Sequence, residues 1–328
     1  ISSSIQFTGT VSYEDNGDIL ILKPMSLEAA VSGKEIPGGE TLLKLNSEIK
    51  MNFDEDTVEI NSLDLAAFDT TIKGQTKVSD LLSGTPKVTS TISMNGKDLP
   101  RLFKIAEIEP LASELGKLPN KTFNVNASLH ADLVNKDLDI DELVLNVFGN
   151  KINAEIYTRN LGSDTPAARG KLNASGPDLP PLIKIAYQFS GASKKEINSL
   201  AKQLASTPKL FNIESVFDID LKAGIADIPS LSIKALGMLT SAKLKAKKIN
   251  SSSPILNGEL EASGPDLPLI MQIVQRMQKA DSESIKLSKN LGKVKSKSFN
   301  IKTNFDANFS SGKIDLPLLS IDTLGVNI

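Results

Sequence analysis

Three stretches of this chain recur at a fixed spacing, and two of them, at 123–133 and 299–310, alternate along their length between apolar and polar residues. Phe123, Phe211 and Phe299 open the copies, which stand 88 residues apart, from 123 to 211 and from 211 to 299. A period of two residues places all the apolar side chains of a strand on one face. The sequence therefore predicts a repeat protein built from strands with one apolar and one wet face.

A second strand follows each alternating stretch after a short turn. The turns are Asn135-Lys136 and Ser311-Gly312, so each pair of strands is expected to form an antiparallel hairpin. In the second strand the alternation slips by one residue near Asp141-Glu142, which predicts a β-bulge. Pro229 and Pro317 fall at the same place in the later copies, where a missing N–H is tolerated. A third and a fourth strand, over 151–158 and 168–175, are expected to complete the repeat.

A short motif marks the end of the fourth strand. It reads Ser-Gly-Pro-Asp-Leu-Pro at 175–180 and again at 263–268, and a degenerate copy lies at 95–100. Gly-Pro ends a strand, the following aspartate can cap a helix, and proline is tolerated in the first helical turn. Asp98, Asp178 and Asp266 are therefore predicted to be structural helix caps and not catalytic groups.

Helices are expected after each copy of the motif. The copy at 175–180 precedes two helical segments, the second of which begins with the capping-box pattern of Ser193 and Glu196. A shorter helical piece is predicted at 111–115 and a less regular one at 282–291. The predicted fold class is mainly β with short α inserts (α+β), in which repeated antiparallel strands form a long curved, trough-like sheet with helices laid on it.

The period also predicts how the chain divides. The expected divisions are 1-42, a partial N-terminal β repeat; 43-122, repeat 1; 123-210, repeat 2; 211-298, repeat 3; and 299-328, a partial and truncated repeat 4. The chain begins with Ile1, and no apolar run reaches the ~18–20 residues of a membrane span. We expect a longer native protein whose targeting segment lies upstream.

Composition argues against several classes of function. The formal net charge is -2 and lysines alternate with acidic residues, so no basic face for nucleic acid stands out. Cysteine is absent, and the only histidine, His130, lies on the wet side of a strand, so no metal site is expected. No phosphate-binding loop or nucleophile elbow is present. We predict a protein that is not an enzyme and uses no cofactor.

The apolar faces need a cover. Burial of one aliphatic side chain contributes about 1.5–3 kcal/mol, so a strand with five or six of them must be covered or it aggregates. The short helices are too few to cover all the strands. Two architectures stay open from the pattern alone: a closed β-sandwich with a dry core, and an open trough with an apolar groove.

The motif at 172–182, the strand opening Phe211-Asn212-Ile213 and the strand ends at 143–149 and 231–237 resemble the AsmA family of Gram-negative envelope proteins. The first 40 residues match only loosely. The resemblance implies a periplasmic protein anchored to the inner membrane by an upstream transmembrane helix. It further implies a non-enzymatic, bridge-like carrier whose apolar β-groove conducts phospholipid acyl chains between the inner and outer membranes.

The candidate lining of this groove consists of the inward residues of the alternating strands. They are Phe123, Val125, Leu129, Phe211, Ile213, Phe217, Phe299, Ile301 and Phe305. The same residues suit an ordinary core. The competing hypothesis is an envelope assembly scaffold or chaperone that binds outer-membrane proteins by adding strands to its sheet edges. An adhesin-like β array is a third possibility.

Overall fold

The computed structural model describes residues 2–33, 40–189, 194–205, 207–277, 290, 296–323 and 326–327. The chain separates into two compact units, Ile1–Ser163 and Asp164–Ile328. This division falls in the loop after β9. The 88-residue repeat boundaries remain a prediction from the sequence.

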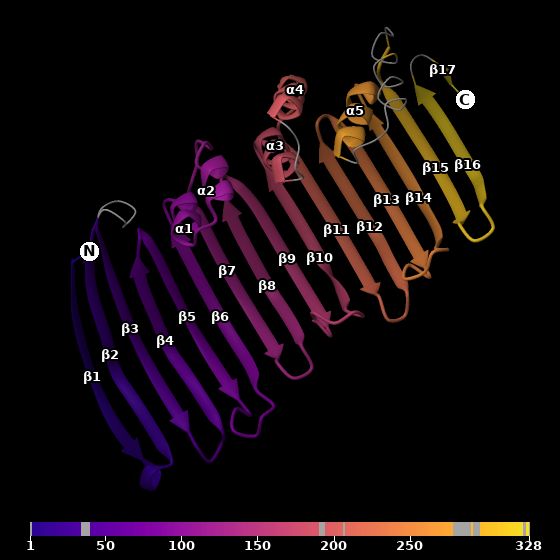
Figure 1. The fold of residues 1–328 in the computed structure, drawn as a ribbon. Helices are drawn as coiled ribbons and strands as arrows, with labels where there is room; N and C mark the ends of the chain where they lie inside the picture. Colours follow the sequence, from indigo (N-terminus) through magenta and orange to yellow (C-terminus); the bar gives the residue numbers. More distant parts are fainter. Residues whose placement is uncertain are drawn as a thin grey trace. The chain divides into compact units, whose positions relative to one another are not determined.

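The first unit is a sheet in which strands adjacent in sequence pair antiparallel from β1 to β9 (Figure 1). Its strands are β1 (Ser2–Glu14), β2 (Ile19–Ser32), β3 (Glu40–Asn52), β4 (Thr57–Ala67), β5 (Thr70–Ser79), β6 (Lys87–Gly96), β7 (Phe123–Asp132), β8 (Asp137–Val147) and β9 (Asn150–Arg159). A 3-10 turn, η1 (Asp15–Gly17), joins the first two strands. Helices α1 (Leu99–Ile105) and α2 (Glu109–Leu115) connect β6 to β7 and lie at the end of the strands where β6 finishes.

The second unit repeats this plan. Its strands are β10 (Ala167–Gly176), β11 (Phe211–Asp220), β12 (Ile225–Ala235), β13 (Met238–Lys247), β14 (Ile255–Gly264), β15 (Phe299–Asn308), β16 (Lys313–Thr323) and β17 (Val326–Asn327). Neighbours in sequence again pair antiparallel. Helices α3 (Leu179–Phe189) and α4 (Lys194–Leu204) lie between β10 and β11, and α5 (Leu267–Met277) follows β14.

The mainly β prediction with short helices is confirmed, as is the hairpin pattern. The predicted β-bulge lies in β8, where the alternation slips. Ser128 of β7 faces Glu142, whereas the next residue of β7, Leu129, faces Ile140. The same irregularity leaves Pro229 between two registers of β12. The helix predicted at 282–291 lies outside the described residues except for Asn290.

The best-developed core lies beneath the helices of the second unit. Leu200 and Leu204 of α4 are 0% and 1% exposed, and they form one cluster with Phe211 and with Ile273 of α5. Partly buried residues of the sheet, Ala174, Ile213 and Ile233, and of α3, Leu179, Leu182 and Ile183, pack against this cluster. The helices therefore cover the end of the apolar sheet face next to Phe211.

Glycine of the recurring motif has a packing role that the motif alone does not reveal. Gly96 faces Phe123 across two strands, and Gly176 and Gly264 face Phe211 and Phe299 in the same way. A Cβ on Gly96 would lie 2.4 Å from the Phe123 ring, and a Cβ on Gly264 would lie 2.8 Å from the Phe299 ring. The rings of Phe123 and Phe299 thus occupy the space above a glycine backbone.

Two of the three aspartates accept the hydrogen bond that a cap requires. Asp98 Oδ1 accepts from the Arg101 backbone N–H at 3.1 Å, and Asp266 Oδ1 accepts from that of Leu269 at 2.9 Å. Asp178 differs, because prolines occupy both the second and third helical positions after it and have no N–H to donate. Asp178 Oδ1 is buried with no hydrogen-bond partner among the described residues. The expectation that all three aspartates cap a helix is therefore wrong for Asp178.

This difference predicts unequal effects of two matched substitutions. Asp266→Ala is expected to lower the free energy of unfolding by about 1 kcal/mol, because an N-terminal N–H of α5 loses its acceptor. Asp178→Ala is expected to change it by less than about 0.5 kcal/mol, because no cap bond is lost. Urea unfolding followed by circular dichroism measures both. Equal losses in the two variants would contradict the assignment.

Candidate functional site

The strand register aligns the apolar side chains of the first unit into rows that cross the strands. One such row, from β1 to β9, consists of Phe7, Leu27, Leu45, Leu65, Ile72, Met94, Val125, Leu145 and Ile152. A second row consists of Tyr13, Leu20, Met51, Val58, Val78, Val88, Ala131, Leu138 and Thr158. A third, from Val11 to Ile156, is interrupted by Thr76 and Ser90, whose hydroxyls lie 2.8 Å apart. We call this surface the apolar face.

The second unit has an equivalent face of smaller side chains. One of its rows consists of Ala174, Ile213, Ile233, Thr240, Ala262, Ile301 and Ile321. Helices α3, α4 and α5 cover the Phe211 end of this face. Bulges in β12 and β16 keep both halves of each strand in phase with these rows.

Most side chains of the apolar face are half-buried and not buried. Leu45, Leu65 and Leu145, for example, belong to this class. Neighbours in the same row and in adjacent rows shield each other laterally, because same-face Cβ atoms of paired strands lie only about 4.5–5.5 Å apart. In the part of the chain that the structure describes, the strands of each unit pair only with their sequence neighbours, and within a unit no further sheet packs onto them.

The nine predicted lining residues divide into two groups. Phe123, Phe211 and Phe299 are only 4%, 8% and 5% exposed, so they belong to the core next to the helices and do not line an open surface. The remaining six are half-buried. Val125 and Leu129 lie on the apolar face of the first unit, and the others lie on the equivalent face of the second unit: Ile213, Phe217, Ile301 and Phe305. The prediction of a lining role therefore needs correction for the three strand-opening phenylalanines.

Sequence reasoning named no lining residue on strands β2 to β6. Leu45, Leu65 and Ile72 nevertheless continue the row of Val125. Their signal is the same period of two, seen in Leu43-Lys44-Leu45 and Leu63-Asp64-Leu65. The strand register of the structure is needed to show that these residues lie on the same surface as Val125.

The opposite face of each sheet is charged and internally paired. Lys77 Nζ lies 2.8 Å from a Glu59 carboxylate oxygen on the next strand, and this hydrogen bond raises the pKa of Lys77 above its usual value. Other cross-strand pairs of this kind are Lys44 with Glu28, Lys73 with Asp64, Lys243 with Glu259 and Lys245 with Asp227. Because these opposite charges are paired, the surface that contacts water carries little net charge.

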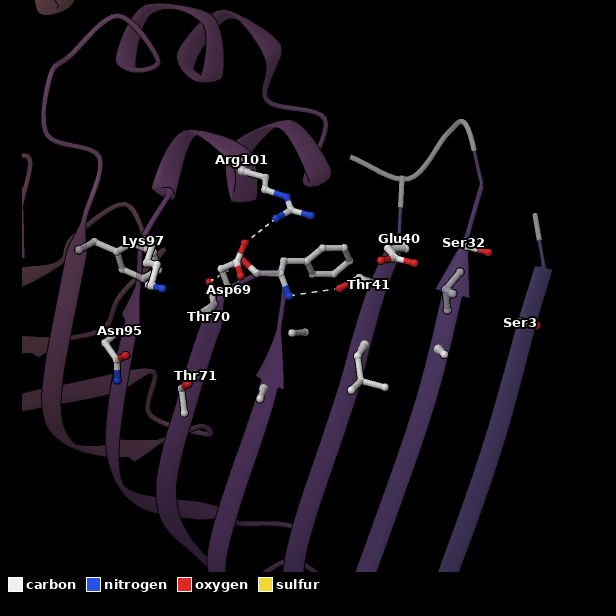
Figure 2. Close-up of a pocket in the computed structure, with 18 of the residues that line it drawn as sticks. Ser3, Ser32, Glu40, Thr41, Asp69, Thr70, Thr71, Asn95, Lys97 and Arg101 are labelled. Atoms are coloured by element: carbon white, nitrogen blue, oxygen red, sulfur yellow. Dashed lines mark hydrogen bonds and ion pairs between the residues drawn. The ribbon is translucent and has the colours of Figure 1, made fainter. Parts of the chain in front are cut away.

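A cavity of about 990 Å³ lies at the α1 end of the first unit (Figure 2). Arg101 of α1 donates to Asp69 at 2.7 Å, and its guanidinium lies 5.7 Å from the centre of the Phe68 ring. Lys97 and Glu40 contribute one further charge of each sign. The cavity therefore joins the apolar face to a polar rim that carries equal numbers of basic and acidic groups.

The remaining chemistry of the described residues is sparse. His130 Nδ1 lies 2.9 Å from the Thr89 hydroxyl, and its Nε2 lies 3.1 Å from Asp141 on the wet face. No group of three or more potential metal ligands occurs in the described part of the chain. Two smaller hollows, of about 540 Å³ and 330 Å³, are lined mainly by polar and charged side chains.

Comparison with family models, with curated proteins and with solved structures finds no match to this chain. Among the helices that the structure describes, none is long and apolar enough to cross a membrane. The geometry of the apolar face is therefore the main basis for a functional conclusion.

Proposed function

We propose that this chain is a non-enzymatic lipid carrier that holds the acyl chains of phospholipids on its apolar face. The observation that carries the proposal is the set of in-register apolar rows across β1 to β9, which no other strand of the first unit's described residues covers. At about 4.8 Å between strands, one row spans roughly 38 Å. That length offers a continuous aliphatic surface for an extended hydrocarbon chain.

The energetics favour an apolar and mobile ligand. Each methylene group moved from water onto the face gains about 0.8 kcal/mol, and the gain is nearly the same at every position along a row. The few polar side chains in the first unit's rows, Thr76, Ser90 and Thr158, form hydrogen bonds within the sheet and leave the rest of each row aliphatic or aromatic. Acyl chains could therefore slide along the face while their head groups stay in water. On this proposal the sheets curve into a trough around the acyl chains.

The cellular setting rests on the resemblance to the AsmA family. It would place the protein in the periplasm, held at the inner membrane by an upstream transmembrane helix. Phospholipids would be the ligands, and they would move between the inner and outer membranes and support outer-membrane homeostasis. The chemistry needs no cofactor, because the ligand is held by burial alone.

The test is lipid extraction from the purified protein. We expect organic solvent to release phospholipid that mass spectrometry identifies, and acyl chains carrying a photoreactive group to crosslink to β3 through β8. A protein that is free of lipid and also resists such crosslinking would refute the carrier function. A crosslink confined to the wet face would refute the assignment of the face.

The competing proposal is an envelope assembly scaffold or chaperone that adds strands from outer-membrane proteins to its sheet edges. Peptide capture without any bound lipid would support the scaffold over the carrier.

A further inference from the structure

The hairpin turn between β4 and β5 has an aspartate where the corresponding turns of the later repeats have a glycine. The three turns are Phe68-Asp69, Phe148-Gly149 and Leu236-Gly237, and all six residues have a positive φ, between 52° and 81°. Glycine adopts this conformation without a steric cost, whereas a residue with a Cβ is strained there. The side chain of Asp69 is therefore held at a conformational cost, which points to a role for its carboxylate.

Two further charged residues lie beside Asp69 where β6 leads into α1. Lys97 and Arg101 stand where the copy of the motif that precedes α5 has Pro265 and Leu269. The Lys97 backbone N–H donates to the Asp69 carbonyl oxygen at 3.4 Å, and the Arg101 guanidinium donates to the Asp69 carboxylate at 2.7 Å. Figure 2 shows Arg101 pointing from α1 toward Asp69. Three departures from the repeat therefore meet in one place, on elements in the interior of the first unit.

In the second unit the same place is filled by apolar contacts. A Cβ on Gly237 would lie 3.2 Å from Pro265 Cγ and 3.3 Å from Pro208 Cγ, so a side chain there would be crowded. In the first unit the turn instead faces the cavity of Figure 2, whose lining also includes the charged Glu40 and the apolar Ala66. The second unit builds the same hairpin and helix start without these charges. The fold itself therefore does not require them.

We propose that this cavity binds the phosphoethanolamine head group of a phospholipid whose acyl chains lie on the apolar face. The inference rests on the proposed function and adds the class of head group. Arg101 and Lys97 bind the phosphate, because guanidinium and ammonium groups are both good donors to phosphate oxygens. Asp69 and Glu40 accept hydrogen bonds from the primary ammonium, which a quaternary ammonium could not donate.

The charge of the cavity favours this class of ligand over an anionic lipid. Two basic and two acidic side chains line it, so a zwitterion is complementary to both signs, whereas an anionic head group leaves the carboxylates opposed to its own charge. The site gives a lipid that slides along the apolar face one preferred position, at the α1 end of the first unit.

Calorimetric titration with two soluble lipids of equal chain length tests the inference. The probes are dihexanoylphosphatidylethanolamine and dihexanoylphosphatidylglycerol. We expect the ethanolamine lipid to bind at least about tenfold more tightly, because a hydrogen bond between charged groups is worth that factor or more. The double variant Glu40→Gln, Asp69→Asn removes both carboxylates, and asparagine tolerates the positive φ of residue 69. It should bring the two affinities to within about twofold of each other.

A second variant installs residues that the second unit has at the same place. Asp69→Gly, Arg101→Leu should weaken binding of the ethanolamine lipid at least about tenfold without lowering the midpoint of thermal unfolding. The matched control, Asp64→Ala, Lys73→Ala, removes an ion pair of 3.3 Å between the same two strands on the wet face. It should leave both affinities unchanged.

The outcomes separate the head-group site from the carrier function. Binding of both lipids with equal affinity, or binding that neither cavity variant changes, would overturn the head-group site and leave the carrier function standing. Binding of neither lipid would overturn both. Equal losses in the Asp69→Gly, Arg101→Leu variant and in its control would also overturn the site.

Discussion

Two carboxylates placed on the apolar face are expected to lower the phospholipid that co-purifies with this chain at least about tenfold. The double variant Leu45→Glu, Ile92→Glu puts one charge on β3 and one on β6, both at half-buried positions of the first unit's apolar face. An unpaired charge held against hydrocarbon costs several kcal/mol, and 1.4 kcal/mol is already a factor of ten in binding. Mass spectrometry of extracted lipid, normalised to protein, measures the effect.

The control uses the adjacent residues of the same strands. Asn46→Glu, Thr91→Glu adds the same charge on the wet face, where both side chains are exposed, and should retain the lipid. Thermal unfolding of the two variants separates a lost ligand from a lost fold. Equal lipid content in the two double variants would show that the apolar face is not the binding surface.

The largest expected effect on stability lies in the second unit. Leu200→Ala is expected to lower its free energy of unfolding by about 2–5 kcal/mol, because a completely buried side chain in contact with α5 and the sheet leaves a cavity. Urea unfolding followed by circular dichroism measures the change.

Leu210→Ala is the matched control, because this leucine is 69% exposed in the same unit. It should change stability by less than about 0.5 kcal/mol. A loss of similar size in both variants would mean that the helices do not hold a core against the sheet. A small loss for Leu200→Ala with normal lipid content would place the stability of this unit in the strand ladder instead.

Local sequence patterns determined the elements of this fold. Alternation predicted the strands, the slip near Asp141-Glu142 predicted the bulge, and Gly-Pro-Asp-Leu-Pro predicted where strands end and helices begin. These features depend on residues close together in the chain, such as a missing N–H or a φ angle fixed by proline. The lack of a helix-cap hydrogen bond at Asp178 could also have been predicted from the sequence, because two prolines without an N–H follow Leu179.

The roles of the phenylalanines required the tertiary structure. Phe123 has the same alternating pattern as Val125, yet it is buried and Val125 is half-buried. Phe123 lies opposite Gly96, which is far away in sequence, and at the end of β7 that follows α2. The period of two predicts which face of the sheet a residue lies on. It does not predict how close to the helices that residue lies along the strand.

The sequence by itself determined that this protein has strands with one apolar face, joined in hairpins and interrupted by short helices. Only the tertiary structure decided which apolar residues are core and which form continuous rows. The physical reason is that side-chain periodicity is a property of one strand, whereas burial depends on register and on what packs across the strand. Register joins residues separated by whole repeats, and no local pattern records it.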